Sequence, residues 1–227
     1  MSPEPNITLY GPARIPFTEK VRLALLYKGL DFQLTEPAGP DDYRRWNPET
    51  GLLPVLDLDG ERIPDSTAIL MKLEETFPEP PLLSRDPRIS GQQRQLESWA
   101  DENLLFFFNR WIQIRDGEAD ESRDNAGGRS FGTGWLRRLG AWLRAGGTWE
   151  RPETALLRGL SDRLGDLVNF LGARPFFYSD RVSMADLAVY GMLLTLQRNS
   201  IPGSHQLLAG RPSLVEFMRR VERETGG

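Results

Sequence analysis

The first third of the chain alternates short apolar runs with a helical pattern. Residues 6–10 (NITLY) and residues 31–35 (DFQLT) have the β-branched and aromatic content, or the alternating polarity, that is typical of strands. Between them, residues 16–28 place apolar side chains on one helical face, and Gly29 follows where a helix should end. This order predicts a strand–helix–strand unit.

The stretch from Gly51 to Ser66 (GLLPVLDLDGERIPDS) combines an apolar run, a tight turn and a helix start. The apolar run predicts a strand, Asp59-Gly60 is a two-residue hairpin turn, and residues 61–63 form the returning strand. Because a proline cannot donate to a ladder, Pro54 is expected at an edge, a bulge or a cis bond. We interpret it as a sign that something other than a neighbouring strand uses this backbone, with protection of an edge strand as the alternative.

A helix is predicted directly after the hairpin, over residues 66–77, and a run of prolines ends it. The preceding residues 36–50 are polar and rich in turn formers, with at most one helical turn around residues 43–46. The resulting order of strands and helices describes a small sheet with helices packed against it, the arrangement called thioredoxin-like.

Strand patterns almost disappear after a linker at residues 82–88, so we predict two domains: an α/β domain over residues 1–82 and an all-helical domain over residues 89–227. The segment 116–133 is acidic and then glycine-rich, and is predicted to be an exposed loop. The helices expected in the second domain cover residues 90–115, 134–145, 153–171, 184–198 and 212–224.

Composition narrows the possible chemistry. The 227 residues include no cysteine, which excludes disulfides, cysteine metal sites and a catalytic thiol of the chain itself. The single histidine, His205, lies in a predicted loop, so neither a histidine metal site nor a Ser-His-Asp triad is expected.

The formal net charge of −4 is unevenly distributed, with −6 over residues 1–82 and +2 over the remainder. Neither part is basic enough for a nucleic-acid partner. No apolar run approaches the roughly 20 residues that span a bilayer, and the N-terminus lacks a secretory pattern, so a cytoplasmic location is expected.

Four segments resemble the cytosolic glutathione transferases, and together they span most of the chain. The run LYGPARIPFTEKVRLALLYKGLDFQL is similar to the first strand, active-site loop and first helix of that family. NPETGLLPVLDLDG resembles its Asn-Pro-x-Gly-x-Val-Pro-Val-Leu segment, with Pro54 in the place of the cis-proline. Asp65 to Ile69 is similar to its Glu-Ser-x-Ala-Ile helix start, and Ser183 to Leu187 to its Ser-x-Ala-Asp element.

The resemblance implies a glutathione site around Pro54. A cis Leu53-Pro54 bond would leave the amide and carbonyl of Leu53 free to pair with an extended peptide, which the family implies is glutathione. Ser66 would hold its γ-glutamyl carboxylate at the helix start, and Asp65 its α-amino group. The structural alternative is that Asp65 or Ser66 only caps the helix.

The usual group that activates the glutathione thiol is absent from its usual place, where this chain has Ile15. An aliphatic side chain cannot stabilise a thiolate by hydrogen bonding. We considered three substitutes: Tyr10 at the end of the first strand, Thr18 in the first helical turn, and Arg14 in the loop between them.

A second departure is Leu52, where the family often has a lysine for the glycyl carboxylate of glutathione. Arg44, Arg45 or Trp46 in the preceding segment are the candidates to replace it, because arginine can hold a carboxylate through two parallel hydrogen bonds.

The electrophile site is expected between the domains, with Phe107 and Trp111 as the substrate-binding side chains. Residues 135–144 (WLRRLGAWLR) are interpreted as a packed amphipathic helix, with a membrane-surface or partner-binding helix as the alternative. Ser183 and Asp186 have capping-box spacing and are assigned a structural role.

The function that follows from the resemblance is addition of the glutathione thiolate to a small hydrophobic electrophile, by a homodimer without a metal. Ile15 and Leu52 keep an alternative open, a binding or scaffold protein that retains the fold and has lost thiol activation.

Overall fold

The computed structural model describes residues 5–13, 15–126 and 151–227, with the backbone alone for residues 118–126. The first part of the chain forms a four-stranded sheet of order β2-β1-β3-β4, in which β1 and β2 are parallel and the other pairs antiparallel. Its elements are β1 (Ile7–Tyr10), α1 (Pro16–Tyr27), β2 (Gln33–Thr35), α2 (Pro40–Trp46), β3 (Val55–Leu58), β4 (Glu61–Pro64) and α3 (Ser66–Thr76). The predicted thioredoxin-like arrangement is confirmed.

One face of the sheet packs on α1 and α3, and the other meets Trp46 of α2. Leu9 is fully buried in the core that includes residues of α1 and α3. Tyr10, the next residue, points to the opposite face because side chains alternate along a strand. There its ring stacks on Trp46 of α2, with 4.7 Å between ring centroids. Helix α2 is longer than the single turn expected, because the packing of Trp46 on this face of the sheet stabilises it.

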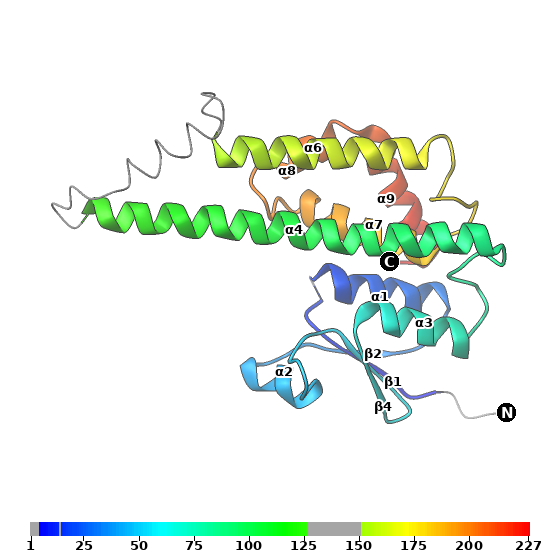
Figure 1. Cartoon of the computed structure of the whole chain (residues 1–227). Helices are drawn as coiled ribbons and strands as arrows, with labels where there is room; N and C mark the ends of the chain where they lie inside the picture. The colour runs from blue at the N-terminus through cyan, green and yellow to red at the C-terminus, as the bar shows by residue number, and fades with distance from the viewer. Residues whose placement is uncertain (1–4, 14, 127–150) are drawn as a thin grey trace.

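In the second part of the chain, the regular elements among the described residues are helices, apart from an isolated bridge between Phe176 and Ser179. It contains α4 (Pro87–Ala126), α6 (Pro152–Leu171), α7 (Met184–Gln197), α8 (Ser204–Ala209) and α9 (Pro212–Thr225). Helix α7 lies at its centre and buries nearly all its residues among the other helices and α1. Figure 1 shows α4 and α6 running side by side as the two long helices of this domain.

Two expectations about loops were wrong. Residues 116–126, assigned to an exposed loop, continue α4, which is 40 residues long. Glutamate, alanine and arginine in this stretch favour helix, and extending an existing helix avoids the cost of nucleation. His205, also assigned to a loop, lies in the short helix α8. The helix predicted over residues 134–145 lies outside the described residues.

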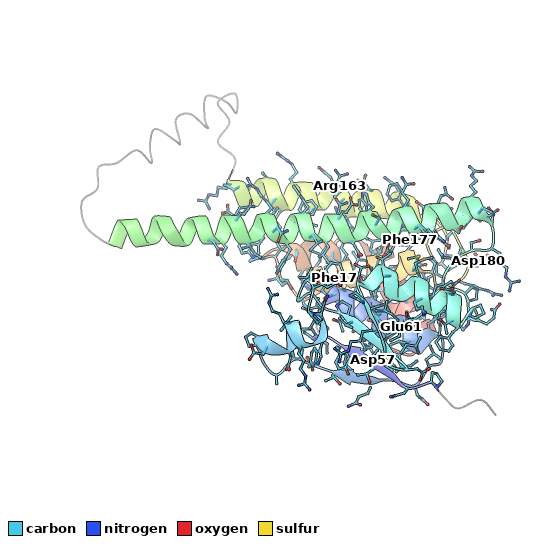
Figure 2. The ribbon with its side chains drawn as sticks, turned by 60° about the horizontal axis from the view of Figure 1, so that its bottom comes forward. Phe17, Asp57, Glu61, Arg163, Phe177 and Asp180 are labelled. Carbon is cyan, nitrogen blue, oxygen red and sulfur yellow. The ribbon has the colours of Figure 1, made fainter. Side chains whose placement is uncertain are left out.

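Helix α1 joins the two domains. It packs on the sheet side against α3 and on the other side against α7 (Figure 1). The approach to α7 is close: a Cβ placed on Gly191 would lie 2.9 Å from the carbonyl oxygen of Pro16. In Figure 2 the sheet residues Asp57 and Glu61 lie on one side of the molecule, and Arg163 of α6 lies on the other.

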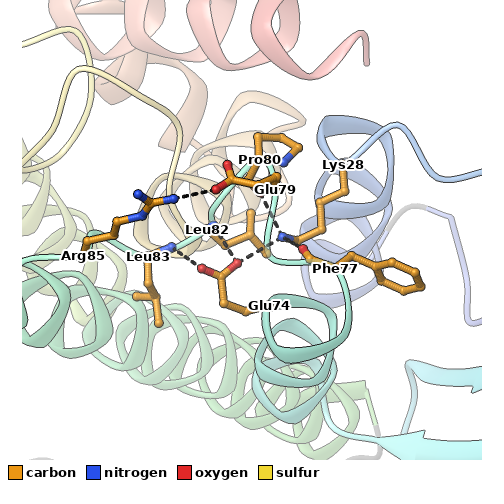
Figure 3. Close-up of polar contacts among 8 residues, drawn as sticks. All are labelled: Lys28, Glu74, Phe77, Glu79, Pro80, Leu82, Leu83 and Arg85. Atoms are coloured by element: carbon orange, nitrogen blue, oxygen red, sulfur yellow. Dashed lines mark hydrogen bonds and ion pairs between the residues drawn. The ribbon is translucent and has the colours of Figure 1, made fainter.

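A buried lysine fastens the connection between the domains (Figure 3). The Lys28 ammonium donates to Glu74 at 3.0 Å and to the carbonyl oxygens of Phe77 at 2.6 Å and Pro80 at 2.9 Å. The Glu74 carboxylate also accepts the amides of Leu82 and Leu83. The Lys28 and Glu74 side chains thus bind the backbone of the segment between α3 and α4.

Candidate functional site

The end of β1, the start of β3 and the end of β4 lie together at one end of the sheet, which we call the sheet edge. Tyr10 is paired with Val55, and Val55 with Pro64. The residues next to these pairs, Pro54 and Asp65, therefore lie side by side, beside the loop that follows β1. This edge brings together backbone from three separate segments of the chain.

The Leu53-Pro54 bond is cis, as expected for this position. Strand β3 begins only at Val55, one residue after the proline. No hydrogen bond among the described residues uses the amide or the carbonyl of Leu53. Both groups remain available to an extended peptide approaching the sheet edge.

Helix α3 begins at the same edge. Asp65 has a positive φ of 73°, and its Oδ1 accepts the amide of Ala68 at 2.9 Å, so it is the N-cap. This conformation is costly for a residue other than glycine, and such strain is concentrated at functional sites. Ser66 opens the helix, and its side chain makes no hydrogen bond with the described residues. The helix start therefore presents free backbone amides and a hydroxyl, which is a favourable place for an anion.

A buried polar network lies behind this helix start and was not found from the sequence. The Lys20 ammonium of α1 donates to Glu97 at 2.8 Å and to Asp101 at 2.7 Å, both on α4. Thr67, the second residue of α3, donates its hydroxyl to the same Glu97 oxygen at 2.5 Å. Only the spacing of Glu97 and Asp101, four residues apart on one helix face, hinted at a shared partner.

Burial raises the pKa of Asp101 to about 6, while the neighbouring Lys20 ammonium acts in the opposite direction. Glu97 and Asp65 add to the rise because their negative charges disfavour a further carboxylate. Asp65 and Asp101 are thus electrostatic neighbours, although 36 positions separate them in the chain.

Two family models match the chain: the N-terminal domain of glutathione S-transferases over residues 9–81, and the C-terminal domain of these proteins over residues 150–226. FtsZ-localized protein A of Caulobacter vibrioides is 33% identical over 184 residues, which cover 76% of this chain and 69% of that protein. The chain belongs to the glutathione S-transferase family.

Other relatives belong to the same family and match different fractions of this chain. Glutathione S-transferase Z1 of Arabidopsis thaliana is 41% identical over 92 residues, which are 37% of this chain and 41% of that protein. The chain thus spans less than half the length of this relative. A glutathione S-transferase of Methylobacterium radiotolerans, solved with glutathione sulfonate, is 28% identical with a TM-score of 0.67, covering 96% of this chain and 90% of that one.

The two described hydroxyls that were expected to activate the thiol are each packed against other parts of the fold. Tyr10 stacks on Trp46 on the face that α2 covers, with the Arg62 guanidinium 5.8 Å from its ring centroid. Thr18 is fully buried, and a Cβ on Gly11 would lie 2.5 Å from its hydroxyl oxygen. Arg14 lies outside the described residues. Ile15 precedes the first residue of α1 and provides no side-chain cap.

Thr18 has one further property. Its hydroxyl is a buried side-chain polar atom without a hydrogen-bond partner among the described residues. A hydroxyl enclosed beneath Gly11 has no open path to a bound thiol, and a buried group without a partner is energetically costly. The Thr18 hydroxyl is thus enclosed at the start of α1, next to the loop that follows β1.

The candidates for the glycyl carboxylate are placed differently from one another. Trp46 is buried beneath Tyr10 and presents no cationic group. Arg44 and Arg45 are exposed on α2, and the Arg44 side chain lies beside Gly51, within 3.5 Å of an added Cβ there. Of these residues, Arg44 is therefore beside the loop that leads to Leu53.

The structure places Phe107 between α4 and α6. Phe107 is buried against Gly159 of α6, and it borders a cavity of about 660 Å³ whose lining residues all belong to α4 and α6. Trp111 packs on the hydrophobic core. Leu105 and Phe108 instead follow Asp101 by four and seven residues, on the helix face that meets α1. Both are partly exposed, at 46% and 39%.

The described residues contain no cluster of acidic or histidine side chains suited to a metal ion. Within the same ranges, no helix is both long and apolar enough to cross a membrane.

Proposed function

We propose that this chain binds glutathione at the sheet edge and transfers its thiolate to a small hydrophobic electrophile. The observation that carries the proposal is the backbone of Leu53, unpaired among the described residues, beside the helix start formed by Asp65, which has a positive φ, and Ser66. A ligand with a peptide backbone and a carboxylate would satisfy both features at once.

Each part of glutathione has a counterpart in the proposal. The cysteinyl backbone pairs with Leu53 as a short antiparallel strand. The γ-glutamyl carboxylate accepts hydrogen bonds from the Ser66 amide and hydroxyl, while the α-amino group faces Asp65, whose Oδ1 already caps α3. Arg44 is assigned to the glycyl carboxylate.

The electrophile is assigned to the partly exposed apolar face of α4 that carries Leu105 and Phe108. Asp101 lies on this same face of α4 and binds Lys20 of α1, so the face is directed toward the first domain. Of the side chains expected from the sequence, Phe107 packs on α6 and Trp111 on the hydrophobic core. Apolar surface at this position would desolvate the thiolate and favour hydrophobic acceptors.

A second candidate function is favoured by Ile15, which stands at the start of α1 where a hydroxyl or thiol would activate glutathione. In that case the chain holds glutathione, or a similar peptide, without chemistry and acts as a binding or scaffold protein. A relative named FtsZ-localized protein A is compatible with such a binding role.

Calorimetric titration with glutathione, together with the ultraviolet absorbance of the thiolate near neutral pH, separates the two functions. Binding with a thiolate signal supports the transferase, and binding without it supports the binding protein. No binding at millimolar glutathione would contradict the transferase.

The same titration tests the site. Ser66→Ala should weaken binding by about tenfold, because it removes a hydrogen bond to a charged group. Ser200→Ala, an exposed serine of the helical domain, is the control and should change nothing. Equal affinity in the two variants would mean that Ser66 does not hold the carboxylate.

Turnover of Tyr10→Phe and Thr18→Ala tests the two hydroxyls suggested by the sequence. If neither variant loses activity, the thiolate is stabilised by other groups at the start of α1. A homodimer remains a prediction from the resemblance, and light scattering of the purified chain tests it. The cytoplasmic location remains a prediction from the sequence pattern.

A further inference from the structure

The network formed by Lys20, Thr67, Glu97 and Asp101 connects three helices at one point. Lys20 belongs to α1, Thr67 to α3, and the two acids to α4. The side chains of Lys20 and Glu97 are only 1% and 4% exposed. It is therefore a buried contact between the domains rather than a surface ion pair.

Stability alone is a weak explanation for this network. Removing two charges from water is expensive, and apolar side chains of similar volume often serve a core equally well. Hydrogen-bonded ions differ from apolar contacts because they impose direction. The single Glu97 oxygen that accepts from both Lys20 and Thr67 sets where the Thr67 hydroxyl must point.

Direction matters at Thr67 because of its neighbours. It directly follows Asp65 and Ser66, and it lies in the first turn of α3, whose amides have no partners within the helix. Anchoring the Thr67 side chain toward α4 fixes the rotation of this turn about the helix axis. The Ser66 amide and hydroxyl are then held facing the sheet edge, whereas an unanchored first turn would fray.

We propose that Thr67 is a positioning residue for the ligand site, with Lys20 and Glu97 holding its hydroxyl so that the helical domain orients the anion-binding turn of α3. This inference rests on the proposed glutathione site. It adds that the affinity of a site built from residues of the first domain depends on a side chain of α4.

The test uses the full chain and S-methylglutathione, which carries the same γ-glutamyl group but has no thiol to ionise. Thr67→Val keeps the size of the side chain and removes the hydroxyl, and should weaken binding by about fivefold or more. Thr67→Ser restores the hydroxyl and should bind like the parent chain. Thr76→Val, at the exposed end of α3, is the matched control and should also bind normally.

Hydrogen–deuterium exchange of the free protein provides a measurement that does not depend on the ligand. Amides in a peptide over residues 64–70 should exchange faster in Thr67→Val than in the parent chain, with no change in Thr67→Ser. The midpoint of thermal unfolding should change little, because Lys20 and Glu97 remain paired.

The outcomes are distinguishable. If the parent chain binds S-methylglutathione and Thr67→Val binds equally well, or if Thr67→Ser loses as much affinity as Thr67→Val, the positioning role is overturned and the proposed site stands. If the parent chain does not bind, the proposed site is overturned. The positioning role is then overturned with it, and the exchange data report only whether Thr67 orders the first turn of α3.

Discussion

Single residues at the sheet edge have roles that depend on the direction of their side chains. Pro54 and Asp65 can be recognised from the sequence as site residues, because a proline inside an apolar run and an Asp-Ser pair before a helix are local patterns. Tyr10 and Thr18 carry no such signal. Whether a hydroxyl faces a ligand, the ring of Trp46 or the backbone of Gly11 is decided by contacts between distant segments.

The carboxyl of Asp101 gives a prediction at this scale. Burial raises its pKa to about 6, above the value near 3.9 of an unfolded aspartate. The folded state therefore binds the proton more tightly, and the stability that this group contributes at low pH is lost as the pH rises through about 6. Lys20, Glu97 and Asp65 are the charged groups that act on it.

Asp101→Asn, which stays neutral, should therefore gain stability relative to the parent chain as the pH rises from about 4 to about 7. Urea unfolding at several pH values measures the difference. Glu102→Gln, an exposed neighbour on α4, should show a difference that does not change with pH. If the parent chain instead gains on Asp101→Asn with rising pH, the attraction of Lys20 outweighs burial and the assigned direction is wrong.

At the scale of elements, side-chain caps fix where helices begin. Helix α7 starts with the capping box expected from Ser183 and Asp186: the Ser183 amide donates to Asp186 at 2.8 Å, and the Ser183 side chain pairs with the backbone of Asp186. The Asp186 carboxylate also accepts the amide of Phe177 at 2.8 Å. This last bond ties the preceding loop to the helix and was not predictable from the spacing.

Asp186→Ala should lower the free energy of unfolding by about 3 kcal/mol, because it leaves two buried amides without acceptors. Asp180→Ala, an exposed acid in the same loop, should change it by less than about 0.5 kcal/mol (Figure 2). Chemical denaturation of both variants provides the comparison. A small effect of Asp186→Ala would mean that water replaces the lost acceptor.

The whole molecule depends on how closely α1 approaches the helical domain. Gly191 of α7 leaves room for the carbonyl of Pro16, at the start of α1. Helix α1 also contributes Lys20 to the network with α4, and its C-cap residue Lys28 binds the connection between the domains. Packing of α1 against α7 therefore fixes the sheet edge relative to the apolar face of α4.

Gly191→Ala should destabilise the chain by about 1–3 kcal/mol, because the added methyl group pushes α1 away from α7. Gly165→Ala is the matched control: it lies in α6 with no atom within 4 Å of an added Cβ, and should be neutral or stabilising by up to about 1 kcal/mol. Thermal unfolding of the two variants tests this. Equal behaviour would show that the interface between α1 and α7 can relax around a methyl group.

The sequence by itself determined the order of strands and helices in the first domain, the unusual position of Pro54, the start of α3 and the capping box of α7. These features depend on residues within a few positions of one another, so periodicity, proline and capping patterns reveal them. Only the tertiary structure decided that Tyr10 faces α2, that Phe107 packs on α6, and that Lys20 joins Glu97 and Asp101. Each of these depends on contacts between segments far apart in the chain, where many pairings share the same local pattern and packing selects one.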